Sequence, residues 1–523
     1  MTSPVRPIDL DALSIGSIQA GALRDRPVTV LGLARSGIAL ARFLADAGAR
    51  VTVYDGRGSD QLTDAIEALG ARSMTLALGP AVDPATTWAD AELVATSPSI
   101  TPDYPTTEPR LRAALRALVA ARAGGDPTAP ALVSEADLFL RLCPAPTIGV
   151  TGTKGKTTTA SLAAALLAAD RDHPAVLGGN IGVPIIERLP ALTPDHRVVD
   201  ELSELQLPTL SRGTTVAVYT NVTADHLDRH GSLEAYQRVK RRLAELVDPG
   251  GALVLNADDP VVAGYADLRS APVVYYRRDW PLPGNGGGIG IIDGWIAAAG
   301  IERLALAGGG RATTGQDGRI MPVAELQIPG AHNISNALAA ISAALLFGVS
   351  PDLIRRAAGA FAGVEHRLER VAVIDGVSFI NDSQGTQPDA VAAALRAFEP
   401  PIVLIAGGRA KGLDLDALAP IVAERAIAAV LIGESGPDLE ASFRAAGLAR
   451  TELAGDLDLA VRRADAIARE ALAASGPAPA VATVLLSPAA ASFDMFADYA
   501  ARGRAFKAAV AVLEAERSRG GNR

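Results

Sequence analysis

The chain has one cysteine, few aromatic residues and no excess of positive charge, and each shortage excludes a class of protein. Cys143 stands alone among 523 residues, so an intramolecular disulfide framework and a thiolate metal cluster are excluded. Aromatic residues make up 4% and the formal net charge is −9 at pH 7, which argues against non-specific binding to nucleic acid. Local basic residues must therefore bind any phosphate group.

Long apolar runs are also missing. No run approaches the roughly 18 apolar residues that a membrane span needs. The segment from Met1 to Leu13 carries acids and prolines where a signal peptide has an apolar core. We therefore expect a cytoplasmic protein without a membrane partner. Hydrophobic residues still make up 49% of the chain, and the length predicts about three domains of roughly 150 residues each.

The sequence is organised around a glycine-rich stretch between an apolar segment, 147–150, and an alanine- and leucine-rich segment, 160–169. The first predicts a buried strand and the second a helix. A strand, a glycine turn and a helix N-terminus form a cradle for phosphate. We expect Lys156 to reach the terminal phosphates and the Thr157 hydroxyl to bind Mg²⁺. Val150 stands where the usual pattern has its first glycine, and an ordinary glycine turn is the alternative.

An earlier segment predicts a βαβ unit. A strand and glycine turn span residues 28–37, a helix spans 38–47, and a second strand, 51–54, ends at Asp55. An acid about twenty residues after the turn is typical of dinucleotide-binding units, but the turn has only two of the usual glycines. NAD, a nucleotide, a nucleotide sugar and no ligand at all therefore remain open. Asp55 and Arg57 could face a ribose, a base or a phosphate.

Polar side chains follow two predicted strands of the middle region. Glu201 ends one strand, and Asp225 and His226 follow the next. Because ligands collect at the carboxyl ends of strands in open α/β sheets, these side chains could surround the same phosphate site as Lys156. A carboxylate with a neutral imidazole suits Mg²⁺ or Mn²⁺. A purely structural histidine is the alternative.

The last part of the chain predicts a further α/β unit that starts near Glu365. Alternating strands and helices between residues 377 and 486 predict a parallel, Rossmann-like sheet. Before it, Asn333 and Asn336 lie at the start of a helix predicted over 334–347, where they could read a purine edge or cap the helix. The final helix is expected to end at Glu514, followed by a frayed polar tail.

Several short motifs occur in the order found in one enzyme family. They are Gly152–Thr158, Gly179–Gly182, Glu201–Ser203, Asn221–His226, Gly330–Asn333, His366–Arg367 and Asn381–Ser383. The chain therefore resembles the Mur ligases, ATP-dependent amide-bond synthetases of peptidoglycan precursor assembly. The segment Leu485–Ser492 and the compact N-terminal βαβ unit look like those of the member that adds D-glutamate. The resemblance covers nearly the whole chain.

The resemblance implies an α/β fold of three domains. Residues 1–133 would form a Rossmann-like domain for the UDP-sugar, 134–365 a central P-loop domain for ATP with a mostly parallel sheet, and 366–523 a Rossmann-like domain for glutamate. The implied reaction joins D-glutamate to UDP-N-acetylmuramoyl-L-alanine through an acyl phosphate. ATP and two Mg²⁺ ions, or Mn²⁺, would be required, and the family implies a monomer.

The resemblance also assigns roles to residues of this chain. ATP would be bound by Gly152, Thr153, Lys154, Gly155, Lys156, Thr157, Thr158, Asn333, Asn336, Arg367 and Asp382. The UDP-sugar would be bound by Arg35, Ser36, Asp55, Arg57, Ser97 and Asn180. Glutamate would be bound by Thr386, Lys411, Ser492 and Tyr499. The metal ligands would be Thr157, Glu201 and His226, and the catalytic group would be Lys156, Glu201, His226 and a carbamylated Lys240.

The chain departs from the family pattern at several places. Lys154 stands where asparagine is usual, Glu204 follows Ser203 where a second serine is usual, and Gln384 replaces a lysine. Because of these changes, a second function remains open beside the D-glutamate ligase. It is a ligase that uses L-glutamate or another acceptor, and the related folylpolyglutamate synthetases are included in this class. A nucleotide-dependent dehydrogenase and an inactive scaffold fit the phosphate loop less well. Two long excursions, residues 101–130 and 281–318, have no functional interpretation.

Overall fold

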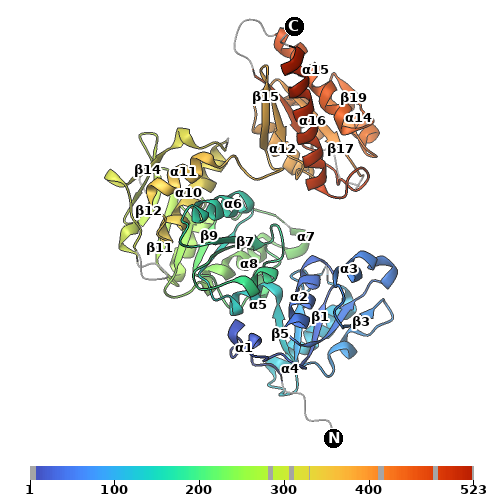
Figure 1. The fold of residues 1–523 in the computed structure, drawn as a ribbon, viewed down its shortest axis with the longest axis vertical. Coiled ribbons are helices and arrows are strands. Elements are labelled where there is room, and N and C mark those ends of the chain that lie inside the picture. Colours follow the sequence, from blue (N-terminus) through green and yellow to red (C-terminus); the bar gives the residue numbers. More distant parts are fainter. Residues whose placement is uncertain are drawn as a thin grey trace. The chain divides into compact units, whose positions relative to one another are not determined.

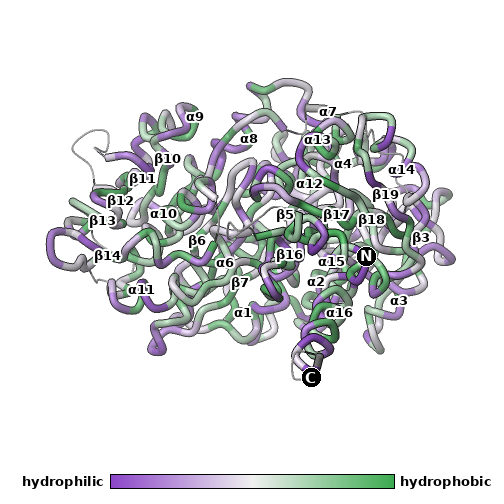
Figure 2. Tube along the Cα trace, turned by 90° about the horizontal axis from the view of Figure 1, so that it is seen from above, coloured by the Kyte–Doolittle hydropathy of each residue, from purple (hydrophilic) through white to green (hydrophobic). Residues whose placement is uncertain are grey.

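A computed structural model of the chain describes residues 7–105, 107–225, 227–280, 287–304, 311–328, 330–409, 417–474 and 481–520. The chain divides into two compact units (Figure 1). The first contains Met1–Leu326 and Ala331–Phe361, and the second contains Gln327–Gly330 and Ala362–Arg523. Much of the hydrophobic colouring lies on strands, and many of the loops between elements are hydrophilic (Figure 2). Within the described ranges, no helix is both long enough and apolar enough to cross a bilayer.

The first sheet of unit 1 is parallel, with strand order β3-β2-β1-β4-β5. Its strands are β1 (Pro27–Leu31), β2 (Arg50–Asp55), β3 (Thr75–Leu78), β4 (Leu93–Thr96) and β5 (Ala131–Ser134). Its helices are α1 (Ile15–Gln19), α2 (Arg35–Asp46), α3 (Thr63–Ala68) and α4 (Pro109–Ala123). The predicted βαβ unit is confirmed as β1-α2-β2. Strand β4 is wholly buried, as expected for a parallel sheet that is covered on both faces.

The second sheet of unit 1 has nine strands in the order β14-β13-β12-β11-β10-β9-β6-β8-β7. They are β6 (Thr147–Thr151), β7 (Ala175–Gly179), β8 (Arg197–Glu201), β9 (Val216–Tyr219), β10 (Ala252–Asn256), β11 (Val273–Asp279), β12 (Gly287–Ile292), β13 (Trp295–Ala299) and β14 (Arg319–Pro322). The seven strands from β12 to β7 in this order, which include β6, pair in parallel. Strands β13 and β14 pair antiparallel with their neighbours. Within the excursion at residues 281–318, strands β12 and β13 therefore form a hairpin, which widens the sheet at one edge.

Seven helices accompany this sheet in the described part of the chain. They are α5 (Glu135–Leu142), α6 (Lys156–Ala168), α7 (Leu227–His230), α8 (Leu233–Leu246), α9 (Pro260–Ala263), α10 (Ala331–Leu346) and α11 (Pro351–Ala360). Helix α10 packs on α6 and is buried along most of its length. Because α10 begins at Ala331, Asn333 lies inside the helix, and the alternative that Asn333 caps it is wrong.

Unit 2 contains a six-stranded sheet in the order β15-β16-β20-β17-β18-β19. The strands are β15 (Glu369–Ile374), β16 (Val377–Asn381), β17 (Ile402–Gly407), β18 (Ala428–Ile432), β19 (Thr451–Leu453) and β20 (Ala482–Leu486). Helices α12 (Pro388–Arg396), α13 (Ala419–Arg425), α14 (Gly436–Ala445), α15 (Leu457–Ala474) and α16 (Tyr499–Gly520) complete the described part. The predicted alternation of strands and helices is confirmed, with β15 added as an antiparallel edge.

The frayed tail predicted after Glu514 is wrong for the described residues. Helix α16 continues to Gly520. Arg462 on α15 forms hydrogen bonds to both carboxylate oxygens of Glu516 (2.7 and 2.9 Å), and Arg517 pairs with the buried Asp465. These ion pairs tie the last turns of α16 to α15, a tertiary contact that the polar composition of the tail does not reveal.

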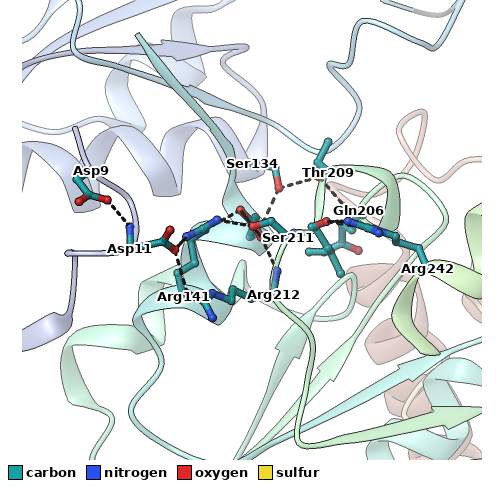
Figure 3. Close-up of polar contacts among 11 residues, drawn as sticks. Asp9, Asp11, Ser134, Arg141, Gln206, Thr209, Ser211, Arg212 and Arg242 are labelled. Atoms are coloured by element: carbon teal, nitrogen blue, oxygen red, sulfur yellow. Dashed lines mark hydrogen bonds and ion pairs between the residues drawn. The ribbon is translucent and has the colours of Figure 1, made fainter. Parts of the chain in front are cut away.

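A polar network joins the segment before β1 to the central part of unit 1 (Figure 3). The Asp11 carboxylate accepts hydrogen bonds from Arg141 (2.8 Å) and Arg212 (2.9 Å). Asp137, which is buried, accepts from Arg141 (3.0 Å) and from the Ser211 hydroxyl (2.8 Å). Because Arg141 and Asp137 lie on α5, which directly follows β5, this network anchors the connection between the two sheets of unit 1.

Two acidic side chains of unit 1 are buried, Glu135 at the start of α5 and Asp200 on β8. Glu135 is 1% exposed, and its Oε1 accepts a hydrogen bond from the Ile186 amide (3.2 Å). Burial raises the pKa of Glu135 to about 7. Asp200 is fully buried, and neither of its carboxyl oxygens has a hydrogen-bond partner within the described part of the chain. Burial, followed by the charges of Glu135 and Glu201, raises the pKa of Asp200 well above its ordinary value.

The raised pKa of Glu135 makes stability depend on pH. The folded protein holds this proton up to about pH 7, whereas the unfolded chain releases it near the ordinary glutamate pKa of 4.5, so stability is lost as the pH rises between these values. We predict that Glu135→Gln, which keeps the acceptor for Ile186, removes this loss. The variant should melt a few degrees above the wild type at pH 8 and close to it at pH 4, since a shift of this size is worth up to about 3 kcal/mol. The exposed Glu67→Gln is the control, and a melting point of Glu135→Gln at or below the wild-type value at pH 8 would contradict the prediction.

Candidate active site

The phosphate loop between β6 and α6 contains two glycines with positive φ. Gly152 has φ +150° and Gly155 has φ +87°. A Cβ atom on Gly152 would collide with the Thr220 hydroxyl, and one on Gly155 would collide with the Asn336 side chain. The loop therefore depends on glycine at both positions. It presents main-chain amides at the start of α6, which is the arrangement that binds phosphate.

The two lysines of the loop differ in their surroundings. The Lys154 side chain is exposed, while its main chain is held by Asn221, which accepts from the Lys154 amide (2.9 Å) and donates to the Lys154 carbonyl (2.9 Å). Lys156 is half-buried, and its ammonium donates to the carbonyls of Gly152 (3.0 Å) and Thr153 (2.9 Å). The ammonium of Lys156 thus lies over the loop, where a bound phosphate would meet it.

The remaining residues predicted for the phosphate side are also found at this loop. Thr157 is half-buried and is the second residue of α6, and Thr158 follows it as a buried residue. The Thr153 hydroxyl lies 3.0 Å from the Tyr236 hydroxyl. Asn336 faces Gly155, and its side-chain amide group donates to the side-chain oxygen of Asn333 (3.0 Å). Both amides predicted to bind adenine are therefore brought to the phosphate loop.

Glu201 has the surroundings expected of a ligand for a cation. It ends β8, next to β6, and is 1% exposed. Its Oε1 accepts from the Asn180 amide group (2.9 Å), while its Oε2 is buried and has no hydrogen-bond partner among the described residues. A buried carboxylate oxygen without a partner is costly, and a divalent cation would satisfy it. Thr157 and Glu201 therefore fit the predicted metal site, and His226 lies outside the described residues.

Lys240 lies beneath the same loop on α8. Its side chain is fully buried, donates to the Thr151 hydroxyl (3.2 Å) and lies 5.6 Å from the centre of the Tyr236 ring. Burial, together with the positive charge of Lys156, lowers the pKa of Lys240 to about 7. A substantial fraction of this amine is therefore neutral at neutral pH, and a neutral amine is a nucleophile.

The predicted UDP-sugar residues meet at the carboxyl end of the first sheet. Asp55, at the end of β2, accepts from the Leu33 amide (2.8 Å) and from two guanidinium nitrogens of Arg57 (2.9 and 2.8 Å). Burial alone would raise the pKa of Asp55, but these hydrogen bonds and the charge of Arg57 hold it below its ordinary value. Ser97, after β4, has a buried hydroxyl with no partner among the described residues.

Arg35 and Asn180 connect this end of the first sheet with Glu201. Arg35 opens α2, with the half-buried Ser36 next to it, and donates to the Gly182 carbonyl (2.9 Å). Asn180 binds Glu201 through both its side chain and its main-chain amide (2.8 Å). A substrate held by these residues would therefore lie next to Glu201.

The predicted residues of unit 2 lie on loops at one end of its sheet. Asp382 follows β16 and accepts from the Ser487 hydroxyl (2.7 Å), and burial raises its pKa to about 6. Ser492 is buried in the loop after β20, and Tyr499, the first residue of α16, is 41% exposed. Two further predicted residues, Arg367 and Thr386, are half-buried. Lys411 lies outside the described residues.

Three features of these sites were not predicted. The buried acids Glu135 and Asp200 lie close enough for the charge of Glu135 to raise the pKa of Asp200, which directly precedes Glu201 in the sequence. Glu204, seen only as a departure from the family pattern, is buried and forms an ion pair with Arg229 (2.6 Å). Arg502 is fully buried, which its position in a polar helix does not suggest.

Comparison with known proteins agrees with this arrangement. A family model described as the Mur ligase middle domain matches residues 150–344. A second, described as the Mur ligase glutamate ligase domain, matches residues 366–490. The first match contains the phosphate loop, Glu201 and Lys240, and the second contains Asp382 and Thr386.

Individual relatives cover nearly the whole chain. The UDP-N-acetylmuramoylalanine–D-glutamate ligase of Symbiobacterium thermophilum is 38% identical over 499 residues, which are 94% of this chain and 100% of the relative. The protein with the same name from Roseiflexus sp. strain RS-1 is 39% identical over 491 residues, covering 91% and 96% of the two chains. A crystal structure of MurF from Acinetobacter baumannii has a TM-score of 0.50 at 15% identity, over 93% of this chain and 97% of that chain, and so shares the fold. The chain belongs to the Mur ligase family.

Proposed function

We propose that the protein joins D-glutamate to UDP-N-acetylmuramoyl-L-alanine with hydrolysis of ATP to ADP and phosphate. The observation that carries the proposal is the set of groups around the phosphate loop. Lys156 lies over the loop, Glu201 has a buried oxygen suited to a cation, and Lys240 is a buried amine of lowered pKa. A phosphate-binding lysine beside a cation site is what phosphoryl transfer uses, whereas hydride transfer by a dehydrogenase needs neither.

The chemistry follows from the poor reactivity of a carboxylate toward amines. The alanyl carboxylate oxygen would attack the γ-phosphorus of ATP, so that ADP leaves and an acyl phosphate forms. The glutamate amine would then attack the acyl carbon, phosphate would leave, and a general base would take the amine proton. Lys156 would neutralise charge on the transferred phosphoryl group. Divalent cations would add Lewis-acid stabilisation of the same charge, with Thr157 and Glu201 as protein ligands and His226 as the further predicted ligand.

Each region of the chain would hold one substrate. Residues 1–133, with the Asp55–Arg57 pair and the Ser97 hydroxyl, are proposed to bind the uridine nucleotide. Residues 134–365 would bind ATP, and 366–523 would bind glutamate. The protein is proposed to act as a cytoplasmic monomer that uses two Mg²⁺ ions, with Mn²⁺ as a substitute.

Lys240 is proposed to act as a carbamate. Its neutral amine would add to CO₂ with release of a proton to solvent, and the resulting anion would replace a buried positive charge near Lys156 by a negative one. This change removes the repulsion between the two lysines that contributes to the lowered pKa of Lys240. The carbamate would lie beside the Thr151 hydroxyl, which now accepts from Lys240 (3.2 Å) and donates to the Leu202 carbonyl (2.8 Å).

We predict that phosphate release from ATP requires both UDP-N-acetylmuramoyl-L-alanine and D-glutamate. L-glutamate, tested at the same concentration, should stimulate release by less than about a tenth of the D-glutamate rate, because the reacting amine would be misplaced. Lys156→Ala, which removes the phosphate-binding ammonium, is the inactive control. Stimulation by L-glutamate alone would assign the alternative acceptor, and no stimulation by either isomer would refute the proposed reaction.

We further predict that Lys240→Ala loses at least about a hundredfold in turnover, since the charge supplied at this position acts in a buried site. Formate or acetate should restore part of the activity by placing a carboxylate in the vacated space. Lys154→Ala, at the exposed lysine of the same loop, should gain nothing from these acids. If Lys240→Ala turns over at the wild-type rate, Lys240 has no carbamate role.

A further inference from the structure

Arg502 is a charged side chain in the interior of unit 2. It lies on α16 and is 1% exposed. Its Nε donates to the Ser383 hydroxyl (3.0 Å), one terminal nitrogen donates to the Ser383 carbonyl (3.0 Å), and the other donates to the Ala490 carbonyl (3.1 Å). One guanidinium therefore joins the loop after β16 to the loop after β20.

The loop after β17 packs against the same guanidinium. Gly408 follows β17 with φ +146°, and a Cβ atom there would lie 3.1 Å from an Arg502 nitrogen and would collide with the Ala491 carbonyl. The next residue, Arg409, donates its amide to that carbonyl (2.8 Å). Strands β16, β20 and β17 are adjacent and parallel, so Arg502 holds together three loops at the carboxyl edge of the sheet, where α/β proteins bind ligands.

The charge of Arg502 is not neutralised by its hydrogen-bond partners. All three acceptors are hydroxyl or carbonyl oxygens. Burial lowers the pKa of Arg502 to about 10, an effect that the charge of Asp494 opposes, so the guanidinium is still protonated at neutral pH. A buried charge acts over a longer range than one in water because it is less screened.

The loops held by Arg502 are those that carry the residues proposed to bind glutamate. Thr386 follows Ser383 in the loop after β16, and Ser492 lies in the loop after β20. The Ser383 hydroxyl, which accepts from Arg502, also donates to the Tyr499 carbonyl (2.8 Å). We propose that Arg502 is a positioning residue for the acceptor amino acid. It fixes the three loops, and its buried positive charge attracts a dicarboxylic substrate that it does not itself contact.

This proposal rests on the proposed ligase function, and it makes a statement about selectivity among the substrates. The positive charge should favour the acceptor with two carboxylates, since glutamate is the substrate assigned to this end of unit 2. Binding of the UDP-sugar, assigned to residues of unit 1, should depend on Arg502 much less, whereas ATP is assigned in part to Asp382, the direct neighbour of Ser383.

The test compares Arg502→Gln, which removes the charge, with Arg502→Lys, which keeps the charge but loses the planar fork that bridges several acceptors. In Arg502→Gln we expect the KM for D-glutamate to rise about tenfold or more, with the KM for UDP-N-acetylmuramoyl-L-alanine changed by less than about twofold and the KM for ATP changed less than that for D-glutamate. In Arg502→Lys the KM for D-glutamate should rise by an intermediate factor. Arg462→Gln, which breaks an exposed ion pair of the same unit, is the matched control and should leave all three KM values unchanged.

A purely structural role would give a different result. It would lower the melting temperature and kcat of the Arg502 variants without a selective rise in the KM for glutamate, and that outcome overturns the proposal. If Arg502→Gln does not fold, Ser383→Ala and Arg502→Lys test the positioning role, because both keep the charge and weaken the contacts that Arg502 makes between the loops. Both variants should raise the KM for D-glutamate more than the KM for UDP-N-acetylmuramoyl-L-alanine. Equal changes in all three KM values would again overturn the proposal. A wild-type protein without glutamate-dependent phosphate release would instead refute the ligase function itself.

Discussion

The structure of the site depends on the close packing of the phosphate loop against two neighbouring segments. Thr220 and Asn221 fill the space beside Gly152 and Lys154, and Asn336 fills the space beside Gly155. Only glycine fits at two positions, so the loop cannot relax around a larger side chain. This contact couples β9 and α10 to the start of α6, and it explains why residues about 70 and 180 positions later in the chain belong to the same site.

Around this loop the protein places charges that are unfavourable on their own. Lys240 is a buried amine close to a second lysine, and Glu201 has a buried oxygen without a partner among the described residues. Each would be stabilised by a bound group, which would be CO₂ or a phosphate for Lys240 and a divalent cation for Glu201. Such uncompensated charges reduce the stability of the folded chain, and they are typical of sites in which transition-state charge is stabilised by groups already in place. In unit 2, Arg502 is likewise a buried charge, and the groups that accept its hydrogen bonds are uncharged.

Much of this could be predicted where the signal is local in sequence. The strand, glycine turn and helix around Lys156 and the βαβ unit that ends at Asp55 follow from periodicity and glycine spacing, and both are found. The predictions failed where tertiary contacts decide. Asn333 lies inside α10, which begins two residues earlier at Ala331 and packs on α6, and α16 continues through its polar end because Arg462 and Arg517 hold it to α15. The burial of Glu135 and Arg502 could not be predicted, because a charged residue in an amphipathic helix is usually exposed.

The central claim is that the phosphate loop transfers a phosphoryl group to a substrate carboxylate before the amide forms. It can be tested by labelling the alanyl carboxylate of UDP-N-acetylmuramoyl-L-alanine with ¹⁸O and analysing the phosphate released in the presence of ATP, Mg²⁺ and D-glutamate by mass spectrometry. The account predicts that each phosphate carries one oxygen atom from the carboxylate, because the acyl carbon–oxygen bond breaks when the amine attacks. Phosphate that contains oxygen only from ATP and solvent, formed together with the amide product, would contradict it.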